Sequence, residues 1–483
     1  MTLLLDRAPT QIPPDRRPLV VDLDGALVKT DMLVETALSA LGSKPQNILH
    51  LLAALGGGKA ELKARAASLS QFDAALLPYN EAVVAIIRGA REAGRPIYLA
   101  SACDKAVAEA VAAHLGLFDG VFSSNGAVNL AGTAKAERLV EAFGESNFEY
   151  IGNDWVDLAV WRRACGCIAV TGSPRLEREL RRMDPSAISL PHEAATLGDW
   201  LRLLRVHQYT KNLLIFAPLV AAHAFTARSI EHAILGFVAF SLCASGVYLL
   251  NDLFDVQADR AHSTKRRRAL AAGRIPLLHG LFAGPLLLGT GLGLGAMTSM
   301  PFLGVIATYV AITMLYTFWL KQKLLVDVVV LALLYVVRVV AGAAAIGAPI
   351  SHWFLGFALF IFTCLALVKR YVECAAAPSG GLRKRAYLGQ DASVLLLLAA
   401  ASGFNAVTVL ALYIASNDVG HLYASPEWLW MLCPVMMYWM SRLIVLAQRG
   451  QVHDDPIVFA LKDRASLLTL GALGVVVGLA TSG

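Results

Sequence analysis

Three aspartates stand close together in the segment YLLNDLFDVQADRAHSTKRRRALAAG, which begins at Tyr248. Asp252, Asp255 and Asp259 are spaced so that a continuing helix would bring all three to one face. Carboxylates this close repel one another unless a cation lies between them. Magnesium prefers such oxygen ligands and bridges to the phosphates of a substrate. The spacing therefore predicts a magnesium diphosphate site, to which Asn251 can add an amide oxygen.

Basic side chains follow the aspartates directly. Lys265, Arg266 and Arg268 carry the positive charge that suits phosphate oxygens, and they come soon after the acidic group in the chain. The alternative is a solvated segment beside a membrane, in which the arginines only fix the orientation of the neighbouring helices. We favour the diphosphate site because the acidic and the basic groups adjoin.

The elements that must position these groups are membrane helices. The chain is 57% hydrophobic and only 16% charged, and its apolar residues form long runs beyond Lys211. This composition excludes an ordinary soluble protein, although the part up to about Trp200 mixes charged and apolar residues as a globular α/β domain does. Apolar runs of about 20 residues predict an all-α polytopic bundle of about nine transmembrane helices. The runs lie at 212–228, 233–252, 277–297, 301–319, 325–347, 353–370, 392–415, 427–447 and 465–482.

The loops of this predicted bundle differ in charge. Those after the second, fourth, sixth and eighth runs are basic, whereas the alternate loops carry little beyond Arg228. The positive-inside rule places the basic loops and the N-terminal domain in the cytosol. We therefore expect a multi-pass protein of the inner (cytoplasmic) membrane. The domains are predicted as 1–195, an interfacial helix or simple linker over 196–211, and a membrane domain over 212–483.

The chain from 200 to 483 resembles the UbiA superfamily. Asn251, Asp252, Asp255 and Asp259 match the first signature of that superfamily, NDxxDxxxD. The resemblance implies a bundle of helices around a central cavity, and many members transfer a prenyl group from a prenyl diphosphate to an aromatic acceptor. Those aromatic transferases carry a second signature, DxxxD. Here Asp327 matches its first aspartate, but Leu331 replaces the second.

That departure favours one branch of the superfamily, the decaprenyl-phosphate phosphoribosyltransferases. The segment DRAHSTKRRRALAAG resembles their DRxHPTKRxRPxAAG, with Ser263 and Ala269 in place of the usual prolines. Four more segments resemble the same branch. They are HQYTKNLLIFAPL with Lys211 and Asn212, LVKRYVE with Lys369, Arg370 and Glu373, RKRAYLGQD with Arg385, Tyr387 and Asp391, and DDPIVFALKDRAS with Asp454, Asp455, Lys462 and Asp463.

Arg338 lies eleven residues after Asp327, close to three helical turns, so both share a helix face. A charge so deep in a membrane is costly unless it faces a polar cavity, which predicts that Arg338 lines the site; a structural salt bridge is the alternative. A phosphoribosyl donor needs metal ligands and several separate cations. The residues predicted to bind it or its acceptor are Lys211, Asn212, Asn251, Lys265, Arg266, Arg268, Arg338, Lys369, Arg370, Glu373 and Tyr387, with Asp252, Asp255, Asp259 and Asp327 as catalytic residues.

The N-terminal part carries a second set of reactive groups. The strand-like run RPLVV leads into Asp22 and Asp24, of which the first can attack phosphorus and the second can shuttle a proton. Ser101, Lys135 and the group Asn153, Asp154 and Asp157 follow at strand ends or before a helix. Their order resembles that of the haloacid dehalogenase (HAD) superfamily.

This second resemblance implies an α/β, Rossmannoid domain with a small helical cap formed by about 30–80. It also implies that Ser101 and Lys135 bind the phosphoryl group and that magnesium is held by Asp22, Asp24, Asp154 and Asp157. Ala26 and Asn153 depart from the family pattern, so a scaffold without turnover is the alternative. We favour an active phosphatase because both Asp22 and Asp24 are present.

Together the two halves predict a bifunctional enzyme. A polyprenyl phosphate would attack ribose C1 of phosphoribosyl diphosphate with Mg²⁺ as cofactor, and the HAD domain would then remove the 5-phosphate. The rival functions are an aromatic prenyltransferase that uses a prenyl diphosphate, and a transporter or lipid-binding membrane protein with a regulatory HAD domain. The expected partners are these two substrates and the bilayer, and no nucleic acid.

Overall fold

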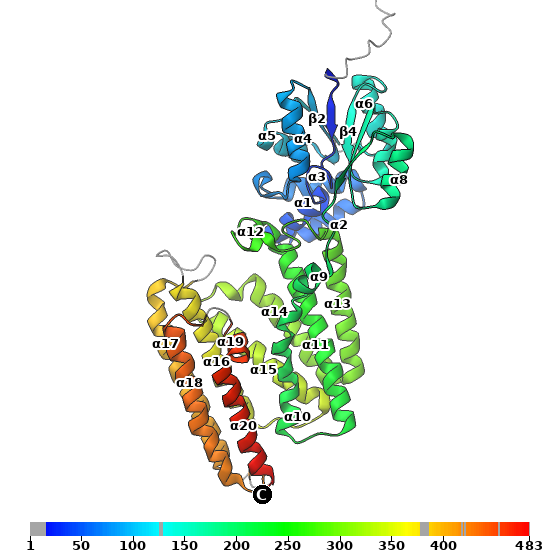
Figure 1. Ribbon diagram of the computed structural model, residues 1–483. Helices are drawn as coiled ribbons and strands as arrows, with labels where there is room; N and C mark the ends of the chain where they lie inside the picture. The colour runs from blue at the N-terminus through cyan, green and yellow to red at the C-terminus, as the bar shows by residue number, and fades with distance from the viewer. Residues whose placement is uncertain are drawn as a thin grey trace, which may run out of the picture. The chain divides into compact units, whose positions relative to one another are not determined.

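The structure is a computed structural model that describes residues 16–124, 129–376, 386–416, 419, 422–452 and 455–482. Its contacts divide the chain into two compact units (Figure 1). The first unit comprises Met1–Leu204 and Tyr248–Gly284, and the second comprises Arg205–Val247 and Pro285–Gly483. The segment with the three aspartates therefore groups with the N-terminal part, a division that sequence boundaries drawn along the chain do not anticipate.

A six-stranded sheet forms the centre of the N-terminal part, with strand order β3-β2-β1-β4-β5-β6. All neighbouring strands are parallel. The central strands β1 (Leu19–Val21) and β4 (Glu149–Gly152) mark the point at which the strand order reverses, which is where ligands bind in open α/β sheets. The other strands are β2 (Ile97–Asp104), β3 (Gly120–Ser124), β5 (Gly166–Thr171) and β6 (Ile188–Pro191).

Side chains alternate along β1 between two cores. Leu19 and Val21 pack with apolar residues of α4 (Glu81–Glu92) and α5 (Lys105–Leu115) on one face of the sheet. Val20 points to the opposite face of the sheet, where it packs with apolar residues of three further helices. Those helices are α6 (Thr133–Phe143), α7 (Leu158–Trp161) and α8 (Pro174–Met183). The predicted α/β domain is therefore confirmed, with helices on both faces of a parallel sheet.

Three short helices come between β1 and α4, where the sequence predicts a helical cap. They are α1 (Met32–Ser43), α2 (Asn47–Leu55) and α3 (Lys59–Leu69), followed by the 3-10 turn η2 (Ala74–Leu76). Asp31 caps α1, because its carboxylate accepts hydrogen bonds from the backbone N–H groups of Leu33 and Val34. After the sheet, α9 (Leu197–Leu203) begins with a capping box in which the side chains and backbone of Thr196 and Asp199 bond reciprocally.

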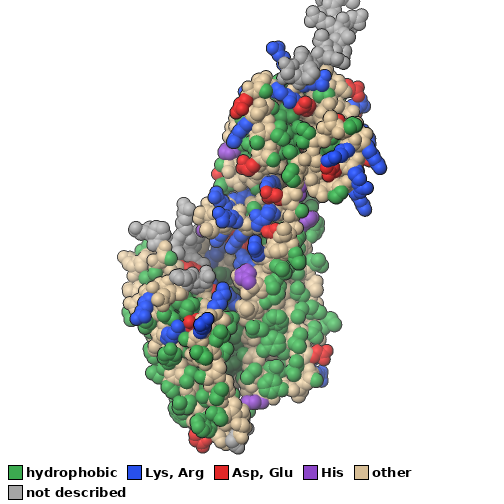
Figure 2. Space-filling view, viewed as in Figure 1, with side chains coloured by type: hydrophobic (Ala, Val, Ile, Leu, Met, Phe, Trp, Pro, Cys, Tyr) green, Lys and Arg blue, Asp and Glu red, His purple; other side chains and the backbone are tan. Residues whose placement is uncertain are grey.

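Eight helices of the described chain are long and apolar enough to cross a membrane. Six of them are α11 (Ala227–Phe254), α13 (Leu277–Thr298), α14 (Met300–Phe318), α15 (Val326–Ile346), α16 (His352–Ala375) and α20 (Arg464–Ser482). The other two spans are Gly389–Ile414, which contains α17 (Ala392–Ile414), and Pro426–Gln448, which contains α18 (Leu432–Gln448). Hydrophobic side chains cover most of the visible surface of these helices (Figure 2). The protein is therefore a multi-pass membrane protein.

The first of the nine predicted spans, 212–228, does not form a long helix. Residues 212–221 of this run belong to the 3-10 helix η4 (Val206–Phe216) and the short helix α10 (Ala217–Ala221), and its last two residues already belong to α11. Pro218 in the first turn of α10 has no N–H to continue the η4 hydrogen bonds, and His223 has a left-handed φ of 49° that ends the segment. The expectation of nine long helices is corrected to eight in the described residues.

This broken segment nevertheless runs along α15 in the same direction. Asn212 accepts a hydrogen bond from Arg338, and Ile215 lies against Gly342 four residues later. A Cβ at Gly342 would stand 2.0 Å from the carbonyl oxygen of Ile215, so the close approach requires glycine at this position. The η4–α10 segment thus follows α15 without being a regular helix.

Candidate active sites

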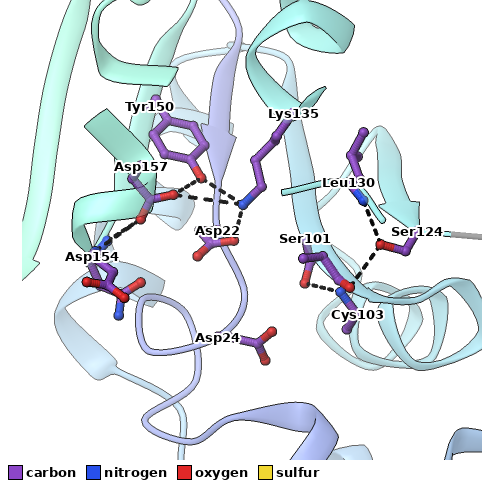
Figure 3. Close-up of polar contacts among 12 residues, drawn as sticks. Asp22, Asp24, Ser101, Cys103, Ser124, Leu130, Lys135, Tyr150, Asp154 and Asp157 are labelled. Atoms are coloured by element: carbon purple, nitrogen blue, oxygen red, sulfur yellow. Dashed lines mark hydrogen bonds and ion pairs between the residues drawn. The ribbon is translucent and has the colours of Figure 1, made fainter. Parts of the chain in front are cut away.

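The phosphatase-like site is built at the carboxyl ends of β1 and β4 (Figure 3). Asp22 follows β1 directly, and Gly25 turns the chain with a φ of +75° that favours glycine. A Cβ at Gly25 would lie 2.2 Å from Nδ2 of Asn153, so the turn packs tightly against the loop after β4. Sequence positions more than a hundred residues apart therefore meet at one sheet edge.

Lys135 of α6 is the cation of this site. Its Nζ donates to Oδ1 of Asp22 at 2.7 Å and to the hydroxyl of Tyr150 at 3.0 Å, and it lies 3.9 Å from Oδ1 of Asp157. Burial lowers the pKa of Lys135, but the carboxylates of Asp22 and Asp157 outweigh burial and raise it. Lys135 therefore stays charged beside Asp22, where it can neutralise a phosphoryl group.

The two aspartates of the DxDG motif have raised pKa values. Burial raises the pKa of Asp22 to about 6, although Lys135 acts in the opposite direction. Burial, with the nearby carboxylates of Asp31 and Asp22, raises the pKa of Asp24 to about 7. Asp24 also accepts a hydrogen bond from the backbone N–H of Met32 at 2.9 Å. An acid with a pKa near neutrality can give a proton to a leaving group, as predicted for Asp24.

The two predicted metal ligands after β4 are placed differently. Asp157 is buried and accepts hydrogen bonds from Tyr150 OH (2.8 Å) and from the backbone N–H groups of Asn153 (2.9 Å) and Asp154 (3.1 Å). Asp154 is exposed and accepts from the backbone N–H of Trp155. Asp157 therefore holds the loop, and Asp154 presents the more accessible carboxylate.

Ser101 lies within β2, which continues to Asp104 and does not end at Ser101 as the sequence predicts. Ser101 is fully buried, and its hydroxyl accepts a hydrogen bond from the backbone N–H of Cys103 at 3.0 Å. Sequence reasoning missed Tyr150, which joins Lys135 to Asp157, and Lys63 of α3. The Nζ of Lys63 donates to the carbonyl of Ala102 at 2.6 Å. No short motif contains Lys63, because it comes from the cap and reaches the sheet edge only in the folded domain.

Two of the three aspartates of the UbiA-like motif, Asp252 and Asp259, bond to the same arginine. Nη1 of Arg268 donates to Oδ1 of Asp252 at 3.0 Å and to Oδ2 of Asp259 at 2.7 Å. The carboxylates of Asp252 and Asp259 are 6% and 5% exposed, so both are withdrawn from bulk water. The helix does not continue as the sequence predicts: α11 ends at Phe254, and α12 (Val256–Arg260) begins after Asp255.

These residues fit a divalent cation. Two carboxylate oxygens converge on one positively charged nitrogen, and Oδ1 of the adjacent Asn251 is buried without a hydrogen-bond partner in the described chain. Burial raises the pKa of Asp259, while Arg268 opposes that effect. Among the described residues, no group of three or more His, Cys, Asp or Glu side chains is arranged to hold a metal. Nη1 of Arg268 occupies the space between the carboxylates of Asp252 and Asp259. Lys265 and Arg266 lie nearby in the sequence and are exposed.

The second unit contains a buried ion pair between α15 and α16. Asp327 is 0% exposed; its Oδ2 accepts from Nε of Arg370, and its Oδ1 accepts from the hydroxyl of Tyr387. Arg370 is 1% exposed and also donates to Glu373 and to Tyr316. Asp327 is therefore engaged by Arg370 and Tyr387, and its catalytic role stays a prediction.

A second polar group of this unit contains Lys211 and Lys369. Both donate to the same oxygen of Asp455, Oδ2, at 2.6 and 3.1 Å. Burial raises the pKa of Asp455, but the two lysines outweigh it and hold that pKa well below its usual value. Sequence reasoning noted Asp455 only as part of a matching segment, whereas the structure makes it the shared partner of two predicted phosphate-binding lysines.

Arg338 lies in the interior of the bundle, as its position predicts. Its guanidinium donates to Asn212 Oδ1 at 3.0 Å and to Tyr309 OH at 3.3 Å, and it stacks over the rings of Phe240, Tyr309 and Tyr335. These partners differ from those of Asp327, although both residues belong to α15. Arg385 and Asp454 lie outside the described residues.

The chain was compared with known proteins. The UbiA prenyltransferase family model matches residues 213–461. A protein of Sinorhizobium fredii, described as uncharacterized protein y4nM, is 39% identical over 471 residues, which cover 95% of this chain and 90% of that protein. The chain belongs to the UbiA prenyltransferase family. The match to the S. fredii protein spans both the N-terminal part and the membrane part of this chain.

This UbiA family member is also 31% identical over 291 residues to the decaprenyl-phosphate phosphoribosyltransferase of Mycolicibacterium smegmatis, covering 57% of this chain and 90% of that protein. The predicted relation to that branch is thereby confirmed. Among solved structures, a UbiA homolog from Archaeoglobus fulgidus bound to GPP and Mg²⁺ has a TM-score of 0.44 at 18% identity, covering 58% of this chain and 99% of that one.

A probable phosphoserine phosphatase from Vibrio cholerae has a TM-score of 0.27 at 13% identity, covering 37% of this chain and 63% of that one. In the N-terminal domain, three helices are inserted between β1 and α4 of a parallel sheet. Asp22 and Asp24 follow β1 and Lys135 lies on α6, as the resemblance of the sequence to the HAD superfamily implies, whereas Ser101 lies within β2. The UbiA family member thus joins a helical membrane domain to an α/β domain with a parallel sheet.

Replacing Asp327 by Asn is expected to lower the free energy of unfolding by about 3 kcal/mol, because the buried Arg370 loses its charged partner on α15. Thermal unfolding of the purified protein in detergent measures this loss. The exposed Glu427, changed to Gln, serves as the control and should leave the unfolding temperature unchanged. An Asp327→Asn protein as stable as the wild type would show that this ion pair contributes nothing to the fold.

Proposed function

We propose that the membrane domain transfers 5-phosphoribose from phosphoribosyl diphosphate to a polyprenyl phosphate, and that the HAD-like domain then removes the 5-phosphate to leave polyprenyl-phosphoryl ribose. The observation that carries the proposal is the convergence of Asp252 and Asp259 on one cationic atom, with exposed basic residues in the same loop. We further propose that both reactions take place at the cytosolic face of the inner membrane.

The first step needs little from protein nucleophiles. An oxygen of the polyprenyl phosphate attacks ribose C1, the bond from C1 to the diphosphate breaks, and the diphosphate leaves. Magnesium, when held by Asp252, Asp259 and Asn251, supplies the charge that stabilises this leaving group. Arg268 is then released from the two carboxylates and, with Lys265 and Arg266, can bind the phosphate oxygens. Catalysis is therefore mainly positioning and electrostatic stabilisation.

The second unit contains cations of its own, two lysines and two arginines. Lys211 and Lys369 share the carboxylate of Asp455, so each could exchange that contact for a phosphate oxygen of a substrate. Arg370 is fixed by Asp327 and Glu373, and Arg338 is fixed by Asn212 and three aromatic rings. Rigid arginines of this kind lose little entropy when they bind an anion.

The contact between Lys135 and Asp22 supports the second proposed step, removal of the 5-phosphate. The Asp22 carboxylate attacks the 5-phosphate phosphorus, the ester bond to ribose O5 breaks, and Asp24 gives its proton to that oxygen. Water then hydrolyses the aspartyl phosphate and releases inorganic phosphate. Asp22, Asp24 and Asp154 supply the carboxylates that would hold magnesium there, and Lys135 neutralises the transferred phosphoryl group.

Leu331 weighs against the aromatic prenyltransferase. It stands where the second DxxxD aspartate would be, and it packs against the apolar core that α15 shares with α16, α17 and α18. A metal ligand is therefore missing from this helix.

The proposal is tested by asking whether the protein uses phosphoribosyl diphosphate or a prenyl diphosphate as the donor. The purified protein, with Mg²⁺ and polyprenyl phosphate, receives labelled phosphoribosyl diphosphate in one reaction, and in another it receives a prenyl diphosphate with an aromatic acid. We expect label from phosphoribosyl diphosphate to enter the lipid phase, and no prenylated aromatic product. Consumption of the prenyl diphosphate, with no label in the lipid, would refute the proposal.

A further inference from the structure

The loop that follows the UbiA-like aspartates is anchored on the N-terminal domain. Nη1 of Arg260 lies 2.7 Å from Oε1 of Glu35 on the cap helix α1, and Nε of Arg260 donates to the carbonyl of Ala271 at 2.9 Å. Glu35 is 0% exposed and Arg260 is 7% exposed. The two residues are 225 positions apart, so this buried ion pair joins distant parts of the chain within one compact unit.

The far end of the same loop is held as well. Nε of Arg274 donates to Oδ1 of Asp199 on α9 at 3.1 Å. Gly273 lies directly against the chain after the DxDG motif: a Cβ there would stand 2.7 Å from Cβ of Lys29 and 2.8 Å from its carbonyl oxygen. The segment from Arg260 to Arg274, called the anchored loop below, is therefore fixed at both ends by residues of the N-terminal domain.

The anchored loop begins next to one metal-binding carboxylate and contains the arginine that bridges two of them. Arg260 follows Asp259 directly in α12, and Arg268 lies inside the loop. A buried ion pair adds little net stability relative to apolar packing, but it is costly to break because the remaining charge stays buried without its partner. Its main effect here is to fix the position of Arg260, and with it the end of α12.

We propose that Glu35 is a positioning residue for the UbiA-like metal site. By holding Arg260, it keeps Asp259 in the orientation in which its carboxylate faces Asp252. The N-terminal domain is then a structural part of the transferase, whether or not it hydrolyses phosphate. This inference rests on the assignment of Asp252 and Asp259 to a divalent cation in the proposed function.

The experiment measures metal affinity directly, without substrate. Binding of Mn²⁺ to the full-length protein in detergent is followed by electron paramagnetic resonance, in an Asp22→Asn, Asp24→Asn background that removes the main metal ligands of the HAD-like site. Asp252→Asn in the same background identifies the signal of the UbiA-like site. We expect Glu35→Gln to raise the Kd of that site for Mn²⁺ by about 10-fold, as loss of a residue that orients a ligand does.

Two further variants separate positioning from folding. Arg260→Gln should raise the Kd as much as Glu35→Gln, and the double variant should raise it no further, because both remove the same contact. Arg260→Lys keeps the charge facing Glu35 and should stay closer to the background affinity. As a matched control, Glu149→Gln breaks an ion pair with Arg95 (2.8 Å) that lies wholly within the N-terminal domain, and it should not change the Kd.

Unchanged Mn²⁺ affinity in Glu35→Gln would overturn the inference. If Glu35→Gln fails to fold, the comparison of Arg260→Lys with Arg260→Gln decides in its place, and equal losses in these two variants would overturn it. The outcome is independent of the reaction catalysed. A wild-type protein that transfers no phosphoribose, together with a Glu35→Gln variant that binds Mn²⁺ weakly, would remove the proposed function and keep the positioning role.

Discussion

Asp252→Asn in the full-length protein is expected to lower the rate of phosphoribosyl transfer by about 10²–10³-fold, the usual loss when one electrostatic group of a transition state is removed. Asn keeps the shape of the side chain and its hydrogen bond from Arg268 but not its charge. The metal is then bound more weakly, and the leaving diphosphate loses its counter-charge. The measurement is the initial rate of label transfer into lipid at saturating Mg²⁺.

Asp184→Asn serves as the matched control for this variant. Asp184 is an aspartate of the same compact unit whose carboxylate bonds to Ser186 and to Cys167 of the α/β domain, so its change should leave the transfer rate as it is. Both variants should keep the wild-type unfolding temperature. Transfer at the wild-type rate in Asp252→Asn would contradict the assignment of this carboxylate to the metal.

Asp22→Asn is expected to abolish removal of the 5-phosphate, with a loss on the order of 10³-fold or more, because no other group in the site replaces the attacking carboxylate. Transfer by the membrane domain should continue. The phosphorylated lipid should therefore accumulate, and mass spectrometry of the lipid extract should show a product heavier by one phosphate than that of the wild type.

The exposed Asp73, which caps η2 in the cap region, gives the control variant Asp73→Asn and should produce the wild-type lipid. Two results would argue against coupling of the two steps. One is the phosphate-free lipid as the product of Asp22→Asn. The other is the phosphorylated lipid as the final product of the wild type.

Much of the N-terminal site was predictable from the sequence, because parallel strands bring their carboxyl ends to one sheet edge. Asp22 directly follows β1 and Lys135 lies in the first turn of α6, close to their predicted places, whereas Ser101 lies within β2 and not at its end. The resemblance to the HAD superfamily and the helical character of about 30–80 gave the cap, where the structure has α1, α2 and α3. They did not give Tyr150 or Lys63, whose roles depend on which neighbour each side chain meets after folding.

The sequence predicted that the second half forms membrane helices, but it predicted the individual elements less well. Apolar length identified the long helices, but the 212–228 run satisfied the same criterion and forms η4 and α10 instead, because Pro218 interrupts the helical hydrogen bonds. The spacing of Asp252, Asp255 and Asp259 suggested one continuous helix. The break at Asp255 shows that two carboxylates can converge through a turn as well.

The spacing of residues along the sequence could not predict which side chains pair with one another. Asp327 and Arg338 share a helix by their separation, yet Asp327 pairs with Arg370 of the next helix, and Arg338 contacts Asn212. The Glu35 to Arg260 pair joins an unremarkable cap glutamate to an arginine of a basic loop. Long-range contacts of this kind follow from the packing of whole elements, which no local motif encodes.

The most direct test of the account is a structure of the protein determined with phosphoribosyl diphosphate and Mg²⁺. We predict density for a metal between the carboxylates of Asp252 and Asp259, with the diphosphate of the donor on that metal and Arg268 moved from the carboxylates to the phosphate oxygens. Donor density away from both aspartates, with Arg268 still bridging them, would contradict it.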